Sequence, residues 1–394
     1  MLKKIPLHIQ IFLGMFLGVI FALIYPDGVG YVTPLGSLFI RLLKMIVVPL
    51  IFVSIVDGIN KVGNAQKLSQ LGFKTTAFYL TTNLLAVLTS LILVNWIKPG
   101  VGVKIFGTHK VPDVAPAEHL FDFIPTNALQ AFTTGNTIQI IFLAILFGVA
   151  ILHMKDKIPT IITVFNEANE LLLKLTGGLV ALAPIGVFGL MAGMVKGMDW
   201  VTFFGVGKFA LVILLGLLIH GGITLPLFFK AMSDRPLIPF VKMMEPALLS
   251  AFSTSSSSAT LPITMECIEK KAGVSKEIAG FVLPVGATVN MDGTAIYEAA
   301  ACLFVAQAIG IELSLAQQLI VFFMSALAAI GAAAIPSAGL VTLVMVLNAV
   351  NLPIEGIGFL LAIDRPLDMS RTIVNVWGDM VGCVVVEGKN ARKK

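Results

Sequence analysis

The chain has 394 residues, of which 57% are hydrophobic and only 12% are charged, and its formal net charge is +5. Ordinary globular domains are about 25% charged, and a soluble protein of this size needs a charged surface to stay dispersed. The composition therefore excludes a cytosolic enzyme, a nucleic-acid-binding protein and a disordered chain, and it predicts a protein embedded in a lipid bilayer.

Apolar stretches long enough to cross a bilayer follow one another along the chain. About 20 predominantly apolar residues cross the hydrocarbon core. The first part of the sequence contains such stretches at 8–26, 34–57, 73–97, 136–153, 168–195 and 202–229. The polar segment 98–127, which contains several prolines and lysines, is expected to be an external loop. From residue 236 onward, polar clusters and small residues interrupt the apolar stretches, which lie at 236–268, 276–310, 314–351 and 356–388. No separate soluble domain is predicted.

The lysine and arginine residues predict how these spans are oriented. With the N-terminus in the cytoplasm, most basic residues outside the spans lie in cytoplasmic loops. The external ones are Lys98, Lys104, Lys110 and Lys196. Cytoplasmic loops of membrane proteins carry such an excess of positive charge. We therefore expect a multi-pass protein with cytoplasmic N- and C-termini. The sequence contains no Asn-x-Ser/Thr sequon, which fits a bacterial or archaeal inner membrane.

Two of the interrupted stretches do not fit a simple crossing. Segment 236–268 has basic residues on both flanks and six hydroxyl residues, 253–258, in its middle. Segment 314–351 has neither Lys nor Arg on its flanks, and the run from Gly331 to Gly339 breaks its helical pattern. Irregular backbone is tolerated inside a membrane only where protein or a watery cavity satisfies it. Two interrupted segments of opposite orientation indicate an inverted-repeat transporter. We predict an all-α membrane protein with eight transmembrane helices and two re-entrant helical hairpins.

A stripe of polar side chains lies in the last span. Asp368, Arg371, Thr372, Asn375 and Asp379 recur at spacings of three or four residues, so they share one face of a helix. Ionisable residues within a span are costly and mark functional sites. Such a face can bind a zwitterion, because Asp368 can hold an ammonium group and Arg371 can hold a carboxylate through two hydrogen bonds. The alternative is an internal Asp–Arg pair that only locks neighbouring helices.

A second polar motif, Asn290-Met291-Asp292-Gly293-Thr294, interrupts the span 276–310. A glycine here breaks the helix and leaves carbonyl oxygens free, and hard cations prefer oxygen ligands. Asp292 and Asp379 can each neutralise a monovalent cation, whereas the alternative for the motif is a simple kink capped by Asp292. Glu298 in the same span is either a proton carrier kept neutral by burial or a hydrogen-bonded structural carboxyl group. The three cysteines and five histidines show no metal-ligand or disulfide spacing, so we expect structural or loop positions for them.

Together, the serine-rich segment, the 290–294 motif and the 368–379 stripe resemble the sodium-dependent dicarboxylate and amino-acid symporters. This family contains the bacterial glutamate and aspartate carriers and the mammalian excitatory amino acid transporters. The resemblance covers nearly the whole chain. It implies a homotrimer in which residues 1–229 are mainly scaffold and trimerisation helices. Residues 236–388, with the span 73–97 and part of 202–229, would form a transport domain that slides across the membrane as an elevator.

The resemblance also implies the binding residues. Substrate contacts would come from Ser256, Ser257, Thr294, Ile335, Gly339, Asp368, Arg371, Thr372 and Asn375. One sodium site would use Gly286, Asn290, Asn375 and Asp379, and a second would use Tyr79, Thr82, Asn83, Asn290 and Asp292. A third would use backbone oxygens near Thr288, Met291, Ala329, Ile330 and Ala332. An arginine at 371 favours glutamate or aspartate, because relatives that carry neutral amino acids lack it. A carboxylate at 379 favours sodium, because some proton-coupled relatives have Asn there.

The chain departs from the family pattern in three respects. Family members often carry an extra Arg where this chain has Ser255 or Met369, and Arg365 is a candidate substitute. Ala334 stands where glycine is common. Glu298 matches a glutamate that the mammalian carriers use for proton coupling. It raises proton co-transport, and potassium counter-transport, as hypotheses.

We predict from these features a secondary active symporter that imports glutamate or aspartate with sodium. Its partners would be the acidic amino acid and membrane lipid. The alternative within the same class is a proton- or sodium-coupled carrier of C4-dicarboxylates such as succinate or fumarate, whose substrate would gain nothing from Asp368. An ion channel fits less well, because two opposed hairpins indicate an occluding site. A membrane enzyme fits least, because no histidine lies near the serine cluster in the sequence.

Overall fold

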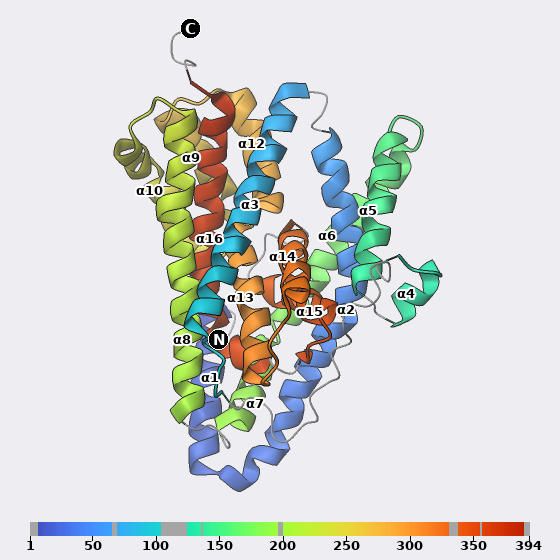
Figure 1. The fold of residues 1–394 in the computed structure, drawn as a ribbon, viewed down its shortest axis with the longest axis vertical. Helices are drawn as coiled ribbons and strands as arrows, with labels where there is room; N and C mark the ends of the chain where they lie inside the picture. The colour runs from blue at the N-terminus through green and yellow to red at the C-terminus, as the bar shows by residue number, and fades with distance from the viewer. Residues whose placement is uncertain are drawn as a thin grey trace.

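The structure is a computed structural model that describes residues 7–64, 69–103, 124–134, 137–195, 200–330, 338–354 and 357–389. Within these ranges the chain forms helices and loops without a β-strand (Figure 1). The all-α class expected from the sequence is therefore confirmed for this part of the chain. The number of membrane crossings stays a prediction.

The first half of the chain follows the predicted spans with one difference. Its long helices are α1 (Leu7–Ile24), α2 (Val29–Asn64), α3 (Ser69–Ile97), α5 (Thr137–His153), α6 (Pro159–Val180) and α7 (Ala183–Val195). The predicted span 168–195 is not one straight helix, because Pro159–Leu179 and Ala183–Gly193 are bent by 51°. Pro184 has no N–H group to continue the hydrogen-bond ladder of α6, which accounts for the break. Most of the predicted loop 98–127 lies outside the described residues, and a short helix, α4 (Ala128–Thr134), follows it.

The second half contains one long span and the interrupted segments. Helix α8 (Trp200–Ile219) passes through a π-helical turn, η4 (His220–Thr224), into α9 (Leu225–Met232). The first interrupted segment forms α10 (Leu237–Thr254), α11 (Ser257–Glu266) and η5 (Cys267–Lys271). The next is divided into α12 (Lys276–Val289) and α13 (Asp292–Ala308). Then follow α14 (Leu315–Ile330), α15 (Ala338–Ala349) and the last helix, α16 (Ile357–Glu387).

Length and hydropathy identify membrane-crossing helices among the described residues. Leu71–Ile97 and Val201–Met232 each qualify as one uninterrupted crossing. Two bent pairs, Ile9–Ile24 with Pro26–Phe39 and Pro159–Leu179 with Ala183–Gly193, would each add one if the pair crosses as a unit. Several of the other predicted crossings contain breaks in the helix or buried charged residues.

The surface of the described part of the chain is rich in large apolar side chains, and a set of charged side chains is buried within an otherwise apolar core. Phe16, Leu218 and Trp96 are 62%, 69% and 80% exposed, whereas Arg371 and Glu298 are buried. A soluble protein keeps most charged side chains on its surface. An apolar exterior around buried charges is what a bilayer requires.

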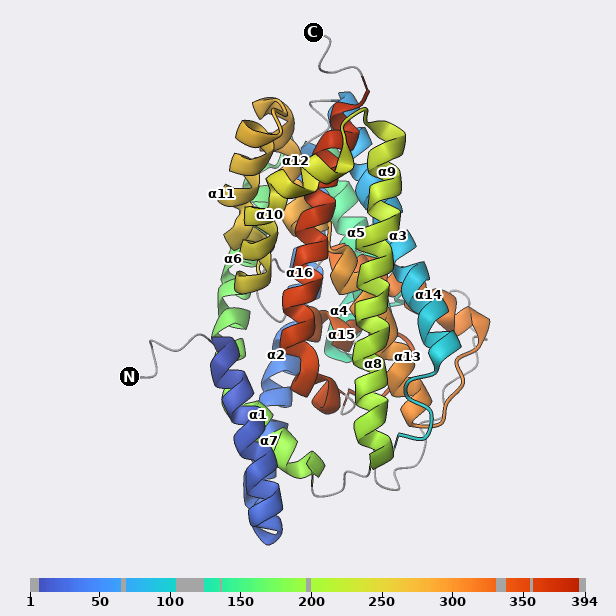
Figure 2. The same cartoon turned by 90° about the vertical axis from the view of Figure 1, so that its left-hand side faces the viewer.

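The helices pack in two groups. α1 packs on α7, and α2 packs on α5, α6 and α7. α16 runs along the centre of the second group, between α8 and α9 on one side and α10 to α12 on the other (Figure 2). It also contacts α13 and α3, and α3 packs along α13. The polar stripe of α16 is thus surrounded by helices from four different segments of the chain.

Both predicted hairpins contain two helices that pack on each other, α10 with α11 and α14 with α15. The first turns at Ser255, whose φ of 50° lies in the left-handed region. Ser256 then caps α11 by accepting a hydrogen bond from the backbone N–H of Ala259. Most of the predicted break in the second hairpin, including Ala334, Ile335 and Ala332, lies outside the described residues.

Candidate functional site

The break between α12 and α13 brings the 290–294 motif against α16. Asn290 and Met291 leave the helical conformation, with φ and ψ of −91° and 81° for Asn290. A Cβ atom on Gly293 would overlap the backbone of Arg371, so a glycine is needed for this close approach. The Gly293 N–H donates to Asn375 Oδ1 at 2.7 Å. The α16 stripe therefore satisfies one of the free N–H groups at the N-terminus of α13.

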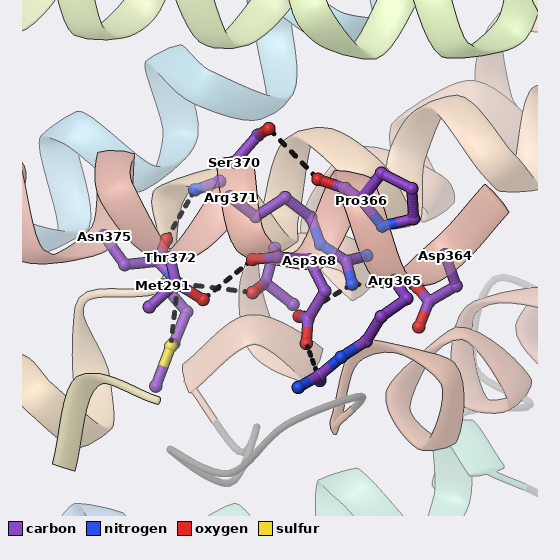
Figure 3. A network of polar contacts seen from close by, with 11 residues as sticks. Met291, Asp364, Arg365, Pro366, Asp368, Ser370, Arg371, Thr372 and Asn375 are labelled. Carbon is purple, nitrogen blue, oxygen red and sulfur yellow. Dashed lines mark hydrogen bonds and ion pairs between the residues drawn. The ribbon is translucent and has the colours of Figure 1, made fainter. Parts of the chain in front are cut away.

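The stripe on α16 is buried, as the helical spacing predicts. Asp368, Arg371, Thr372, Asn375 and Asp379 are all buried. Thr372 Oγ1 donates to the backbone carbonyl of Asp368 at 2.8 Å, and Asn375 Nδ2 donates to Met291 Sδ at 3.2 Å (Figure 3). The predicted substrate side chains of α16 thus lie on one connected polar face.

Arg371 is at the centre of this face. Its Nη2 donates to Asp364 Oδ1 and to Asp368 Oδ1, both at 2.8 Å, and its guanidinium carbon lies 3.9 Å from the centre of the Tyr297 ring. Among the described residues, its Nε and Nη1 atoms have no hydrogen-bond partner although they are buried. A cation that is held on one side and stacked on an aromatic ring is fixed in orientation. Its Nε and Nη1 point to different sides of the guanidinium, and each remains available as a charged donor to a carboxylate.

The remaining predicted substrate residues lie on three different elements. Asn375 Nδ2 is 3.5 Å from Thr294 Oγ1 on α13. A Cβ atom on Gly339 would lie 3.2 Å from Arg371 Nη1, so the start of α15 closes on the guanidinium. Ser256 and Ser257 form the buried tip of the first hairpin, whose two helices both pack on α16. Ile335 lies outside the described residues.

The first predicted sodium set is brought together. Asn290 Nδ2 donates to Asp379 Oδ1 at 3.0 Å and approaches the backbone carbonyl of Asn375 at 3.4 Å. The Asn290 N–H donates to the Gly286 carbonyl at 2.9 Å. A Cβ atom on Gly286 would overlap both Asp379 Oδ1 and the Tyr79 hydroxyl. Carboxylate, amide and carbonyl oxygens therefore lie within a few ångströms of one another.

The second predicted sodium set adjoins the first. Thr82 Oγ1 on α3 lies 3.4 Å from Asp292 Oδ1 and 3.5 Å from Asn290 Oδ1. Asn83 is buried beside Thr82 in sequence, and both its amide atoms are without a partner among the described residues. Tyr79 differs from the expectation in one respect, because its hydroxyl donates to the Val282 carbonyl at 3.0 Å. The hydroxyl and carboxylate oxygens converge as a hard cation requires.

The third predicted set is only partly described. Thr288 is at the end of α12, with its hydroxyl donating to the Val285 carbonyl at 3.0 Å, and Met291 follows in the break. Ala329 and Ile330 end α14, which contacts α12. Ala332 lies outside the described residues.

Glu298 is fully buried on α13, one turn beyond Thr294. Thr342 on α15 and the charge of Arg371 both interact electrostatically with its carboxyl group. The two carboxyl oxygens have no hydrogen-bond partner among the described residues. Both hypotheses for it, proton carrier and structural carboxyl group, remain predictions.

Sequence reasoning missed the contacts of His220 and Tyr297 and left the position of Arg365 open. His220, expected at a structural or loop position, is buried with Nε2 2.9 Å from Asp292 Oδ2. Tyr297 forms the face under Arg371. Arg365 donates from Nη1 to Asp368 Oδ2 at 3.3 Å, so the candidate substitute arginine reaches the stripe (Figure 3). A histidine followed by two glycines inside an apolar span was the available signal for the first contact.

Comparison with known proteins gives consistent matches along the chain. The model of the sodium:dicarboxylate symporter family matches residues 7–389. Excitatory amino acid transporter 3 of Mus musculus is 35% identical over 89% of this chain and 78% of its own length. The proton/sodium-glutamate symport protein of Bacillus caldotenax is 31% identical over 98% and 94%. The proton/glutamate-aspartate symporter of Bacillus subtilis (strain 168) is 34% identical over 98% and 95%.

Proposed function

Since this chain belongs to the sodium:dicarboxylate symporter family, we propose that it imports glutamate or aspartate across the membrane together with sodium. The names of the similar proteins, which include excitatory amino acid transporters and bacterial glutamate symporters, support an acidic amino acid as the substrate and sodium and protons as the coupled ions.

The observation that carries the proposal is the buried guanidinium of Arg371. Its Nη2 is occupied by Asp364 and Asp368, whereas its Nε and Nη1 have no partner in the described part of the chain. A buried donor without a partner costs about 1–3 kcal/mol, and a hydrogen bond from a charged donor to a carboxylate is among the strong ones. The side-chain carboxylate of the substrate accepts from one of these free donors. Asp368 holds the substrate ammonium. Without substrate, Arg371 Nη2 donates to the same carboxylate.

The polar groups around these two residues complete the substrate site. Thr294, Thr372 and Asn375 supply hydroxyl and amide groups, and the hairpin tips close over the substrate through Ser256, Ser257, Ile335 and Gly339. The position of Gly339 against Arg371 supports this arrangement, because a larger residue there would meet the guanidinium.

Sodium ions occupy the oxygen clusters on either side of Asn290. One site uses Gly286, Asn290, Asn375 and Asp379, the second uses Tyr79, Thr82, Asn83, Asn290 and Asp292, and the third uses Thr288, Met291, Ala329, Ile330 and Ala332. Asn290 and Asn375 contact both the cation clusters and the residues of the substrate site. Binding at one site therefore favours binding at the other, and this linkage is the coupling free energy.

The transport step moves one group of helices against the other. α10 to α16, with α3 and part of α8, form the moving domain, and α1, α2 and α5 to α7 form the scaffold of a homotrimer. The packing of α3 and α8 on α13 and α16 supports this division. The protein lies in a bacterial or archaeal inner membrane with cytoplasmic termini, and it has no catalytic activity. Protons enter through Glu298, with potassium counter-transport as the accompanying hypothesis.

Uptake into proteoliposomes tests this function. Labelled glutamate, aspartate and succinate are supplied while sodium, proton or potassium gradients are imposed one at a time. We expect an inward sodium gradient to drive accumulation of glutamate or aspartate, with succinate competing weakly. Succinate accumulation at a rate equal to that of glutamate would favour the C4-dicarboxylate alternative, and accumulation without sodium would refute sodium coupling.

A further inference from the structure

The middle of the α8–α9 span contains a π-helical turn whose residues are not among the proposed substrate or sodium ligands. The turn comprises His220–Thr224 and interrupts an otherwise regular apolar helix. A π-turn is rare, and inside a helix it is found frequently at functional sites. Its first residue, His220, is fully buried in a span where an ionisable side chain is costly.

His220 contacts one oxygen of Asp292 and leaves the other available. Its Nε2 lies 2.9 Å from Asp292 Oδ2, and both side chains are completely buried. Asp292 Oδ1 instead lies with the hydroxyl of Thr82, at 3.4 Å. An ionised carboxylate accepts hydrogen bonds only, so Nε2 carries the hydrogen. The two oxygens of Asp292 thus have different partners. Oδ2 accepts from His220, and Oδ1 lies near Thr82.

The π-turn itself is fixed to α16. The indole Nε1–H of Trp377 donates to the Gly221 carbonyl at 3.0 Å, and a Cβ atom on Gly221 would lie 3.4 Å from the Val374 side chain. The widened turn frees a carbonyl for Trp377 and directs His220 toward the start of α13. Contacts with α16, an element of the proposed transport domain, therefore fix the turn that carries His220.

We propose that His220 is a positioning residue for sodium. By holding Asp292 Oδ2, it directs Oδ1 toward the space shared with Thr82, Asn83 and Asn290, where a sodium ion binds. The buried amide of Asn83, which has no partner among the described residues, is an independent sign of a missing ligand there. This inference rests on the second sodium site of the proposed function. Hydrogen-bond partners of metal-binding carboxylates typically change metal affinity 10- to 100-fold when removed.

The test measures the half-saturating sodium concentration for glutamate uptake into proteoliposomes. We expect His220→Ala to raise it about 10- to 100-fold, with the glutamate KM at saturating sodium unchanged. His220→Gln, whose amide N–H replaces Nε2–H, restores most of the sodium affinity. His220→Asn is one methylene shorter and does not. The matched control is His153→Ala, since His153 is exposed on α5 and contacts the Val149 carbonyl of its own helix.

A structural lock between α8 and α13 would give a different result. It would lower the amount of folded protein and raise the sodium and glutamate constants together, without rescue by His220→Gln. That result, or an unchanged sodium constant in His220→Ala, overturns the proposal. If His220→Ala does not fold, the half-saturating sodium concentrations of His220→Gln and His220→Asn are compared. A lower value for His220→Gln supports the proposal, and equal values overturn it. Asp292→Asn distinguishes an error about His220 from an error about the second sodium site. If Asp292→Asn also leaves the half-saturating sodium concentration unchanged, the second sodium site itself is wrong.

Discussion

Replacing Arg371 by cysteine removes the group assigned to the substrate side-chain carboxylate. The structure gives the size of the effect, because the free donors Nε and Nη1 lie on different sides of the guanidinium, so one carboxylate accepts from one of them. A hydrogen bond to a charged group contributes about 1.5–3 kcal/mol. Losing it corresponds to roughly a 10- to 150-fold rise in the glutamate KM. Arg371→Lys keeps the charge but not the planar guanidinium, so we expect a smaller increase.

The same substitution also affects folding, and the assay must separate the two effects. Arg371 Nη2 is shared by Asp364 and Asp368, and removing one partner of a buried ion pair costs about 3–5 kcal/mol of stability. Arg235→Met is the matched control. Arg235 is a nearly buried arginine paired with Glu387 at the far end of α16, with N–O at 2.5 Å. It should lower stability without changing the glutamate KM.

The readout is the uptake of glutamate and of serine by the same proteoliposomes at saturating sodium. Cysteine at 371 leaves room and removes the charge, so Arg371→Cys should lose glutamate uptake and gain serine uptake. Serine uptake by the variant demonstrates that it is folded. A glutamate KM within threefold of the parent value would refute the assignment of the free Arg371 donors to the substrate.

Three further changes test the cation sites and proton coupling. Asp379→Asn should raise the half-saturating sodium concentration roughly 30-fold or more, since losing a buried charge partner costs about 2–5 kcal/mol. The control is Glu266→Gln, which removes an exposed carboxylate. If Asp379→Asn and the parent have the same sodium dependence, Asp379 does not bind sodium. Gly286→Ala inserts a methyl group where it overlaps Asp379 Oδ1, so sodium-driven uptake should fall at least about tenfold, whereas Gly280→Ala on the same helix meets open space and should transport normally. Glu298→Gln should abolish acidification linked to uptake while sodium-driven exchange continues; unchanged proton flux would show that Glu298 is structural.

Helical periodicity was sufficient to predict the α16 stripe. Residues three and four apart share a face whatever the rest of the fold does, so Asp368, Arg371 and Asn375 could be grouped from the sequence. The break at Asn290 and Met291 was equally local, because a glycine and polar residues in an apolar span indicate it. The bend before Pro184 was missed even though its cause is local, because length and hydropathy alone favoured a single span.

Contacts between distant segments could not be predicted from these patterns. His220 and Asp292 are 72 positions apart, and no periodicity relates them. The same holds for the stacking of Arg371 on Tyr297, which depends on how α13 crosses α16. The residues of the three sodium sites were predicted only from the resemblance to the family. The particular oxygen that each residue offers depends on side-chain rotation, which only the packed structure defines.

The distribution of buried charge explains why substrate and sodium need each other. The ion-pair cluster on α16 is balanced, since Asp364 and Asp368 are paired with Arg365 and Arg371. Asp292 and Asp379 differ, because in the described part of the chain neither is paired with Lys or Arg, and their contacts are His220, Thr82 and Asn290. Burying an unpaired carboxylate is costly. A glutamate that enters beside them adds a further negative charge. Mobile cations must therefore supply the positive charge that the fold omits, and the fixed arginines alone cannot make substrate binding independent of sodium.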